Sequence, residues 1–434
     1  MQISNCGKLY ESKQQKQDIN ILILAYSYLH GIRHPTISNT QLRSVNALKS
    51  STAYLFFWAA FPGYFFYHCI KAITPVPYIG WFSVVLLLCA GLSIAGNSFA
   101  LVMGKIRTAS WPVSLPFALL ILIMGASVLL NHQFNREPYI DMEGGITNIL
   151  TIAWMVALFQ IGRSFDFSGR RAPFLLLVIA FALCAWAFFD SASGKMLLPI
   201  LPGDDSDSAN YQGMARSVFC AAVVMIPFLK GRWFRSTMMA AVAAILYLIG
   251  SRTELAMLLL IAPVFSLVNF KVRAALAMMA ASIVLMGGLM LTGVDILGLA
   301  AEYASEDASI AQRSMLLDAG LEGIAESPIT GDYLGQVRDF GATGYYIHNA
   351  LSMWQQFGVI SFVLYVGLCL GSLCIGLAYL VVGRPSPHVE VLFYLSLACL
   401  VGVATTKSIF WPIPALAWGI AAQVIVTRAA PHRK

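Results

Sequence analysis

The stretch Gly344–Leu351, with the sequence GYYIHNAL, marks the place where a long polar segment returns to apolar sequence. The polar segment begins near Gly293, and an uninterrupted apolar run follows from Phe357. An apolar run of roughly 20 residues is long enough to cross the hydrocarbon core of a bilayer as a helix. Loops longer than about 15 residues are uncommon and usually carry function. We therefore expect a helical membrane domain organised around this one loop.

The composition of the whole chain indicates the same class of protein. Of the 434 residues, 58% are hydrophobic and 11% are charged, and the mean hydropathy is +0.73. These values lie far outside the usage of soluble domains. The alternating segments typical of transmembrane barrels are absent, so backbone hydrogen bonds must be satisfied within helices. We predict an all-α, polytopic membrane protein.

Apolar runs of spanning length predict about twelve transmembrane helices. They lie at residues 52–70, 79–103, 111–131, 146–163, 172–189, 213–229, 233–250, 253–270, 274–293, 357–382, 389–406 and 409–427. The chain then divides into a cytoplasmic tail (1–50), helices 1–9 (51–293), a loop with short helices (294–356) and helices 10–12 with the C-terminus (357–434). No cleavable signal peptide is expected at the start of the tail.

The distribution of charges supports this layout and assigns its orientation. Lys and Arg accumulate in the cytoplasmic loops of membrane proteins. If the N-terminal tail is cytoplasmic, 20 of the 28 basic residues lie inside, and 17 of the 21 acidic residues lie outside. Both termini are then cytoplasmic, and the long loop lies on the opposite side. The net charge of +7 reflects basic residues that we expect to contact anionic lipid headgroups. Nucleic-acid binding is not expected, because no basic run is interleaved with base-stacking aromatic residues.

Cysteines and histidines do not form a recognisable metal or disulfide pattern. Seven of the eight cysteines fall in apolar spans or at their ends, without CxxC spacing, so we interpret them as small hydrophobic residues. The histidines are scattered, and no metal or other cofactor is expected. The acidic run Asp204–Asp207 is the alternative metal site. A solvated loop is favoured there because its offsets do not fit a calcium-binding loop.

The middle of the long loop predicts an amphipathic helix that carries Arg313. Ser309–Gln312 has the spacing of a capping box, and Ser327-Pro328 ends the pattern. The apolar face of this helix consists of Ile310, Leu317, Leu321 and Ile324. Arg313 shares that face, where burial of a guanidinium requires an anionic partner. That partner is either a ligand or a loop carboxylate such as Glu306 or Asp307.

His348, the one histidine in the long loop, is the candidate general base. A neutral imidazole with a pKa of about 6.5 can accept a proton from a hydroxyl group. The N-terminus of the helix expected near Asn349 would disfavour the charged imidazolium. In the alternative interpretation, Asn349 only caps that helix and His348 is a partly buried neighbour. Tyr345, Tyr346 and Trp354 either stack on sugars or belong to the interfacial aromatic belt.

Two further arginines, Arg216 and Arg252, sit at the outer mouths of predicted spans. Guanidinium groups at the depth of lipid headgroups can bind a diphosphate through paired hydrogen bonds while the lipid tail lies between helices. The alternatives are snorkelling, helix capping and, for Arg252, an ion pair with Glu254. Arg338 is a secondary candidate for contact with an anion or a glycan.

Several of these elements together resemble the bacterial O-antigen ligase and O-antigen polymerase superfamily. The resemblance covers roughly residues 245–382 and agrees with the twelve-span layout. It rests on Ser251-Arg252, the Arg313 helix with its end at Glu326–Gly331, the segment Tyr346–Leu351, Trp354, and Phe357-Gly358. Many members have an aliphatic residue four positions after the histidine and a glycine eleven positions after it. This chain departs from that pattern, with Ser352 at the first place and Gly358 ten residues after the histidine.

The resemblance implies a metal-independent, inverting glycosyltransferase of the bacterial inner membrane, without a cofactor. The donor would be a glycan on undecaprenyl diphosphate, and the acceptor would be the lipid A core or a repeat unit of O-antigen or exopolysaccharide at the periplasmic face. His348 would deprotonate the acceptor, and Arg313 with Arg216 or Arg252 would bind the departing diphosphate. Arg338, Asn349 and Tyr346 would be secondary site residues. The shared motifs leave ligase and polymerase both open.

A transporter or flippase for lipid-linked sugars is the principal alternative from another class. Transport favours ionisable groups near the middle of the membrane and two similar halves. Here the charges cluster at the ends of the predicted spans, and the long loop occurs once. A purely structural membrane protein is the weakest alternative.

Overall fold

The computed structural model describes residues 52–429 of the chain with internal gaps. The gaps comprise residues 75–86, 89, 93, 96–109, 135–141, 165, 167–170, 192–194, 199–209, 271–307, 342–344 and 383–385. The N-terminal tail, the acidic run Asp204–Asp207 and the predicted span 274–293 lie outside the described residues. Of the predicted span 79–103, only short helical pieces between residues 87 and 95 are described.

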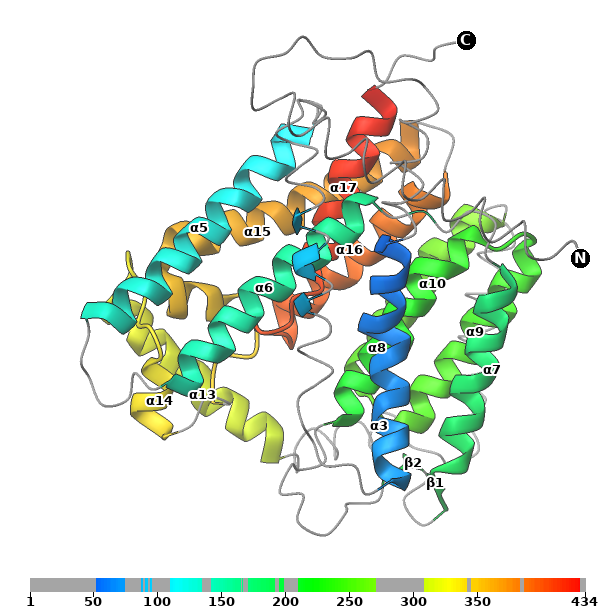
Figure 1. Ribbon diagram of the computed structural model, residues 1–434, viewed down its shortest axis with the longest axis horizontal. Coiled ribbons are helices and arrows are strands. Elements are labelled where there is room, and N and C mark those ends of the chain that lie inside the picture. Colours follow the sequence, from blue (N-terminus) through cyan, green and yellow to red (C-terminus); the bar gives the residue numbers. More distant parts are fainter. Residues whose placement is uncertain are drawn as a thin grey trace, which may run out of the picture. The chain divides into compact units, whose positions relative to one another are not determined.

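The described chain is predominantly helical (Figure 1). Residues 52–58 are helical and lead into the π-helical turn η1 (Ala59–Gly63). The elements that follow are α3 (Tyr64–Ile73), α5 (Trp111–Phe134), α6 (Met142–Ser164), α7 (Arg171–Ala187), β1 (Phe189–Asp190), β2 (Lys195–Met196), α8 (Asn210–Met225), η3 (Ile226–Phe228), α9 (Arg232–Ile249), α10 (Arg252–Asn269), α13 (Ala308–Glu326), α14 (Gly335–Phe340), α15 (Leu351–Val382), α16 (Pro387–Thr405) and α17 (Pro414–Ala429). The strands β1 and β2 pair as an antiparallel ribbon.

Seven of the described helices are long and apolar enough to cross a membrane. They are α5, α6, α8 continued by η3, α9, α10, α15 and α16. The chain is therefore a helical membrane protein with several spans, as its composition predicts. The count of about twelve is not reached within the described residues for three reasons. The helices α7 and α17 have only 17 and 16 residues, and the first predicted span is divided between η1 and the short α3. The predicted spans 79–103 and 274–293 lie mostly or wholly outside the described residues. The twelve-span layout remains a prediction.

The core of the bundle forms around α8 and α16, whose surfaces are the most buried of the seven spans. The helix α16 packs against α15, α17, α10 and α8, and it lies between the other helices in Figure 1. Glycines allow a close contact between α6 and α17, where a Cβ at Gly162 would overlap the Leu416 carbonyl and one at Gly419 would overlap the Phe159 carbonyl. Small residues at such crossings let helix backbones approach within a membrane.

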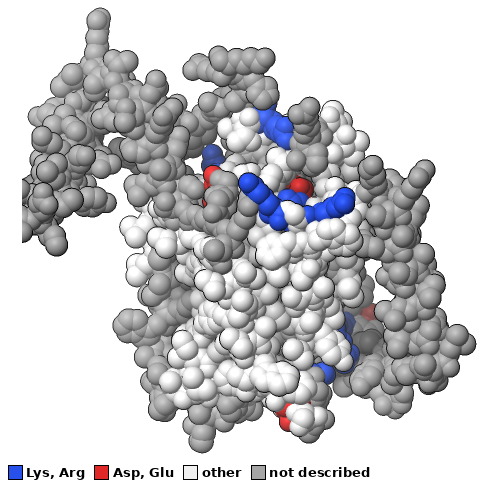
Figure 2. Space-filling model, turned by 90° about the vertical axis from the view of Figure 1, so that its right-hand side faces the viewer, with Lys and Arg blue, Asp and Glu red and all other residues white. Residues whose placement is uncertain are grey.

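The outward faces of the long helices are apolar. Leu122 and Leu129 of α5 and Val363 and Leu377 of α15 are all exposed. In the view of Figure 2, charged side chains gather near the upper and lower ends of the face, and uncharged surface separates them. This arrangement is the one expected of a surface that contacts lipid.

Polar contacts join helix ends that share a predicted side of the membrane. At the predicted inner ends, Arg235 of α9 contacts Asn269, the last residue of α10, and Glu390 in the first turn of α16. At the predicted outer ends, Lys407 after α16 contacts Glu254 in the first turn of α10. The start of α9, the end of α10 and the start of α16 therefore meet at one end of the bundle, and the start of α10 meets the turn after α16.

Candidate functional site

The site is built on a break in α15. The helix begins at Leu351, six residues before the span start predicted at Phe357, and it is interrupted at Gly358. Gly358 has φ 79° and ψ 175°, a conformation open to glycine but not to residues with a Cβ. A Cβ there would overlap the Ile329 carbonyl, and one at Gly331 would meet the Gly358 nitrogen at 2.6 Å. Glycine at both positions lets the loop after α13 lie directly on the break.

Hydrogen bonds fix that loop to the two sides of the break. The Asp332 nitrogen donates to the Gln355 carbonyl at 2.6 Å, and the Val359 nitrogen donates to the Pro328 carbonyl at 3.3 Å. The Trp354 indole donates to the same Pro328 carbonyl at 2.7 Å. An interrupted helix leaves backbone groups that need outside partners, and the loop supplies them. The end of α13 is thereby held against the start of α15.

The helix α13 presents Arg313 on its packed face, although the face differs from the predicted one. The buried positions are Leu316, Gly320, Gly323 and Ile324, and Arg313 precedes them by one turn and is partly buried. Leu321, predicted to lie on this face, is 44% exposed, which corrects the prediction. The reason is that glycines form the contact: the Ile347 side chain fills the space where a Gly320 Cβ would stand. A packed face made of glycines cannot be predicted from the periodicity of apolar side chains.

Residues 346–352 are held by contacts with three elements. Ile347 is buried against α13, and the Ala350 nitrogen donates to the Val403 carbonyl of α16 at 2.5 Å. The Leu351 nitrogen donates to Asn349 Oδ1 at 2.8 Å, so Asn349 caps α15 and has the structural role considered as its alternative. Ser352 donates to the Asn349 carbonyl at 2.7 Å and accepts from the Ile409 nitrogen at 3.0 Å.

His348 is partly buried at the centre of this arrangement. Its ring lies 5.2 Å from the ring of Tyr346, measured between centroids. Burial lowers the pKa of His348 below its ordinary value of 6.5, and the positive charges of Arg313 and Lys407 lower it further. A neutral imidazole at neutral pH has a free lone pair and can accept a proton. The charge of Arg313 therefore favours the neutral form of His348.

Tyr346 packs between His348 and the turn after α16. Its ring packs on Phe410 with 4.7 Å between centroids, and its hydroxyl is hydrogen-bonded to Ser408. Burial raises the pKa of Tyr346, while the Ser408 bond and the positive charge of Arg216 oppose the rise. Arg216, partly buried in α8, therefore acts on the same aromatic side chain that lies against His348.

The sequence did not single out Lys407, which lies in the turn after α16. Its Nζ lies 2.7 Å from Glu254 Oε1, and the two side chains are 12% and 1% exposed. Ser251 donates to the other oxygen of the same carboxylate. Its predicted location could have identified it, since Lys407 is one of only eight basic residues predicted on the outer side of the membrane. Glu254 was considered as a partner for Arg252, whereas these contacts assign its two oxygens to Lys407 and Ser251.

The remaining candidates have other settings. Arg252 is the first residue of α10 and is exposed. The Lys195 alkyl chain packs against the nearby Gly250. Arg338 lies in α14 and binds Asp332 at 2.9 Å and Asp339 at 2.8 Å. The Asp339 bond, followed by the other contacts with these carboxylates, raises the pKa of Arg338 against the effect of burial. Arg338 thus has its carboxylate partners within the protein.

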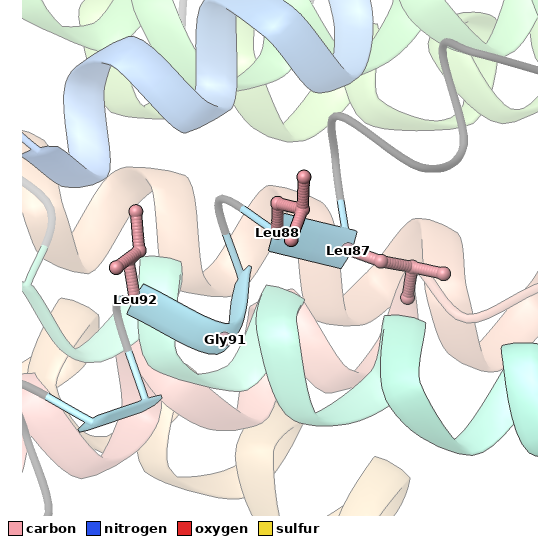
Figure 3. Close-up of a pocket in the computed structure, with 4 residues that line it drawn as sticks. All are labelled: Leu87, Leu88, Gly91 and Leu92. Atoms are coloured by element: carbon pink, nitrogen blue, oxygen red, sulfur yellow. The ribbon is translucent and has the colours of Figure 1, made fainter.

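The chemistry of the site follows from these groups. Among the described residues, no three His, Cys, Asp or Glu side chains are arranged to hold a metal ion. An open hollow lined by Leu87, Leu88, Gly91 and Leu92 contains none of the candidate residues, and its lining offers no charged side chain (Figure 3). A neutral imidazole on which the charges of Arg313 and Lys407 act can accept a proton, and guanidinium and ammonium groups can bind an anion. No protein-family model matches the chain, and no curated protein matches its sequence.

Proposed function

We propose that the protein is a metal-independent, inverting glycosyltransferase of the bacterial inner membrane. It moves a glycan from undecaprenyl diphosphate to an acceptor sugar hydroxyl at the periplasmic face, as an O-antigen ligase or as a polymerase of O-antigen or exopolysaccharide. The observation that carries the proposal is that His348 is partly buried and that burial and the charges of Arg313 and Lys407 lower its pKa. The motif resemblance supplies the class of donor and acceptor.

In the proposed reaction, His348 takes the proton of the acceptor hydroxyl as the hydroxyl oxygen bonds to the anomeric carbon of the donor. The bond between that carbon and the diphosphate oxygen breaks, and its electron pair leaves with undecaprenyl diphosphate. Attack opposite the leaving group inverts the anomeric configuration. This route needs one base and a stabilised leaving group, with no nucleophile from the enzyme.

Arg313 and Arg216 are the proposed contacts for the departing diphosphate. Both are partly buried, so their charges act in a medium of lower dielectric than water. Donors aimed at developing negative charge contribute about 10²- to 10³-fold each to the rate of related reactions. Arg252, exposed at the start of α10, is proposed as an outer contact where the diphosphate enters.

The test is glycan transfer by the full chain in proteoliposomes loaded with a lipid-diphosphate-linked glycan and an acceptor. His348→Ala is expected to lower transfer by about 10²- to 10⁴-fold, the usual contribution of a general base. His132→Ala is the matched control, because His132 is also predicted outside but contacts Tyr333 through its ring nitrogen at 3.2 Å. It is expected to transfer normally.

Normal transfer by His348→Ala at equal protein abundance would overturn the assignment of the base. Movement of the lipid-linked sugar across the bilayer without a new glycosidic bond would support the transporter instead. The products of a deletion strain then separate the two enzyme classes. Single repeat units on the lipid anchor indicate a lost polymerase, and long chains retained on undecaprenyl diphosphate indicate a lost ligase.

A further inference from the structure

The start of α10 has the sequence of a capping box but not its geometry. Ser251 and Glu254 occupy the two positions of the S-x-x-E motif, in which the glutamate normally bonds to the backbone nitrogen of the capping serine. Here the Ser251 nitrogen donates to the Leu246 carbonyl at 3.3 Å, and the Ser251 side chain caps no helix amide. The Ser251 hydroxyl instead donates to the Glu254 carboxylate. The carboxylate is thus directed away from the cap.

Instead of capping the helix, the Glu254 carboxylate forms a buried ion pair with Lys407. Glu254 is 1% exposed, and its Oε1 lies 2.7 Å from the Lys407 ammonium. Removing two charges from water costs several kcal/mol for each ion, and their attraction often only offsets that cost. Stability alone therefore gives little reason for placing this pair here rather than capping the helix. Its position beside the proposed site offers a functional reason.

The turn that carries Lys407 is joined to the segment that carries His348. The backbone nitrogen of Lys407 donates to the Gly402 carbonyl at 2.8 Å, and the next carbonyl, of Val403, accepts from Ala350. Two residues after Lys407, the Ile409 nitrogen donates to Ser352 at 3.0 Å. The backbone segments that carry Lys407 and His348 are consequently fixed to each other.

The Lys407 ammonium has N–H donors that the contact with Glu254 does not occupy. A lysine ammonium carries three N–H donors, and the contact with Glu254 Oε1 requires one of them. The Lys407 charge acts on His348 together with the charge of Arg313. Lys407 therefore acts on the same imidazole as one arginine of the proposed diphosphate site.

We propose that Lys407 is a third cation of the site for the departing diphosphate and that Glu254 fixes its ammonium there. The proposal rests on the proposed glycosyltransferase function. Glu254 takes one N–H of the ammonium and so sets its direction, and a remaining N–H bonds to a diphosphate oxygen. The carboxylate also offsets one of the three positive charges when no diphosphate is bound, which lowers the repulsion among the cations. Ser251 holds the carboxylate in this arrangement.

The experiment is calorimetric titration of the detergent-solubilised full chain with farnesyl diphosphate, a short analogue of the lipid diphosphate. Lys407→Met keeps the length of the side chain and removes the charge. It is expected to weaken binding roughly 10- to 100-fold, the effect of a lost bond between charged groups. Lys230→Met is the matched control, because Lys230 is exposed before α9, at the helix end opposite to the α9–α10 turn, and should bind like the wild type.

The double variant Lys407→Met/Glu254→Gln separates binding from folding. It leaves no uncompensated buried carboxylate, so it should recover the thermal stability lost in Lys407→Met while its diphosphate binding stays weak. Recovery of wild-type binding by the double variant would overturn the proposal, because Lys407 would then serve only to neutralise Glu254. Wild-type binding by Lys407→Met would overturn it as well.

The controls also separate this inference from the proposed function. If Arg313→Met loses farnesyl diphosphate binding and Lys407→Met does not, the diphosphate site stands and the role of Lys407 is wrong. If the wild-type protein itself binds no farnesyl diphosphate, the inference is overturned together with the diphosphate site on which it rests.

Discussion

Two ion pairs tie α16 to its neighbours at opposite ends of the bundle, and they differ in how completely their cations are bound. Arg235 donates to the Leu229 carbonyl at 2.9 Å, to Asn269 Oδ1 at 2.8 Å, to Glu390 Oε2 at 2.9 Å and to the Pro227 carbonyl. Lys407 makes one contact with a carboxylate and lies 5.9 Å from the centre of the Trp411 ring.

The difference shows that similar buried pairs can have different purposes. Arg235 is bonded to four acceptors, so its guanidinium has little capacity left for a ligand. Its partners belong to η3, α10 and α16 and to the turn before α9, which is the pattern of a structural lock. Lys407 retains donors, and its charge, like that of Arg313, lowers the pKa of His348. Saturation of hydrogen bonds distinguishes the lock from the site more clearly than burial does.

The largest effect is expected from removing the saturated cation. Arg235→Met leaves Glu390 buried without its charge partner, and such a loss typically lowers the free energy of unfolding by about 3–5 kcal/mol. Thermal unfolding in detergent measures this change. Transfer per folded molecule should remain normal, since Arg235 lies at the other end of α16. Undiminished stability would show that the lock does not hold the bundle together.

At the site, Arg313→Met should lower the rate of transfer by about 10²- to 10³-fold without a comparable loss of stability. A general base must be neutral, so the wild-type rate should fall only as pH drops below 6.5, through the lowered pKa of His348. Removing the Arg313 charge raises that pKa toward its ordinary value and moves the acid limb of the pH–rate profile to higher pH. An unmoved limb would contradict the proximity of the two groups.

Ser352→Ala is expected to loosen the turn after α16 that carries Lys407 and to leave the Arg235 end of the bundle unchanged. The hydroxyl bridges the Asn349 carbonyl and the Ile409 nitrogen within the protein, and an unsatisfied buried partner costs about 1–3 kcal/mol. Hydrogen exchange of the amides at residues 407–410 should increase, while exchange near Arg235 should not. Equal increases at both ends would mean that the two ends are not independent.

The smallest effect is expected at the exposed ion pair of α14. Arg338 is 38% exposed in its side chain, and solvent screening limits such pairs to about 0–1 kcal/mol. Arg338→Met should therefore change stability slightly and leave transfer normal, which also makes it the matched control for Arg313→Met. A large loss of transfer would restore Arg338 as a direct contact of the glycan.

Much of this arrangement could be predicted from hydropathy and charge, because membrane helices must bury apolar runs and place basic residues asymmetrically. The helices α5, α6, α8, α9, α10 and α16 lie close to their predicted ranges. The end of α13 at Glu326 was predicted from Ser327-Pro328. Arg313 and His348 were both predicted as site residues, and the charge of Arg313 contributes to the lowered pKa of His348.

What could not be predicted depends on contacts between distant residues. The packed face of α13 is made by Gly320 and Gly323, which carry no apolar signal of their own. Glu254 has the spacing of a cap, and only the fold shows that its partner is Lys407, more than 150 residues later. The break at Gly358 requires the loop after α13 to supply its hydrogen bonds, so the apolar run alone places the helix start too late.

Because α15 is broken at Gly358, the rotation of its first part about the helix axis is not fixed by the rotation of the span that follows. In a continuous helix, deleting one residue from the span would turn everything before it by about 100°. Here the first seven residues, Leu351–Phe357, are bonded to α13, α16 and the Ile409 backbone, and Gly358 permits a change of direction before the span continues. A one-residue change after Gly358 would therefore rotate the lipid-facing surface of the span while His348 keeps its orientation. The cost of such a change would fall on the buried face that carries Tyr365 and Cys369, which packs within the bundle after the break.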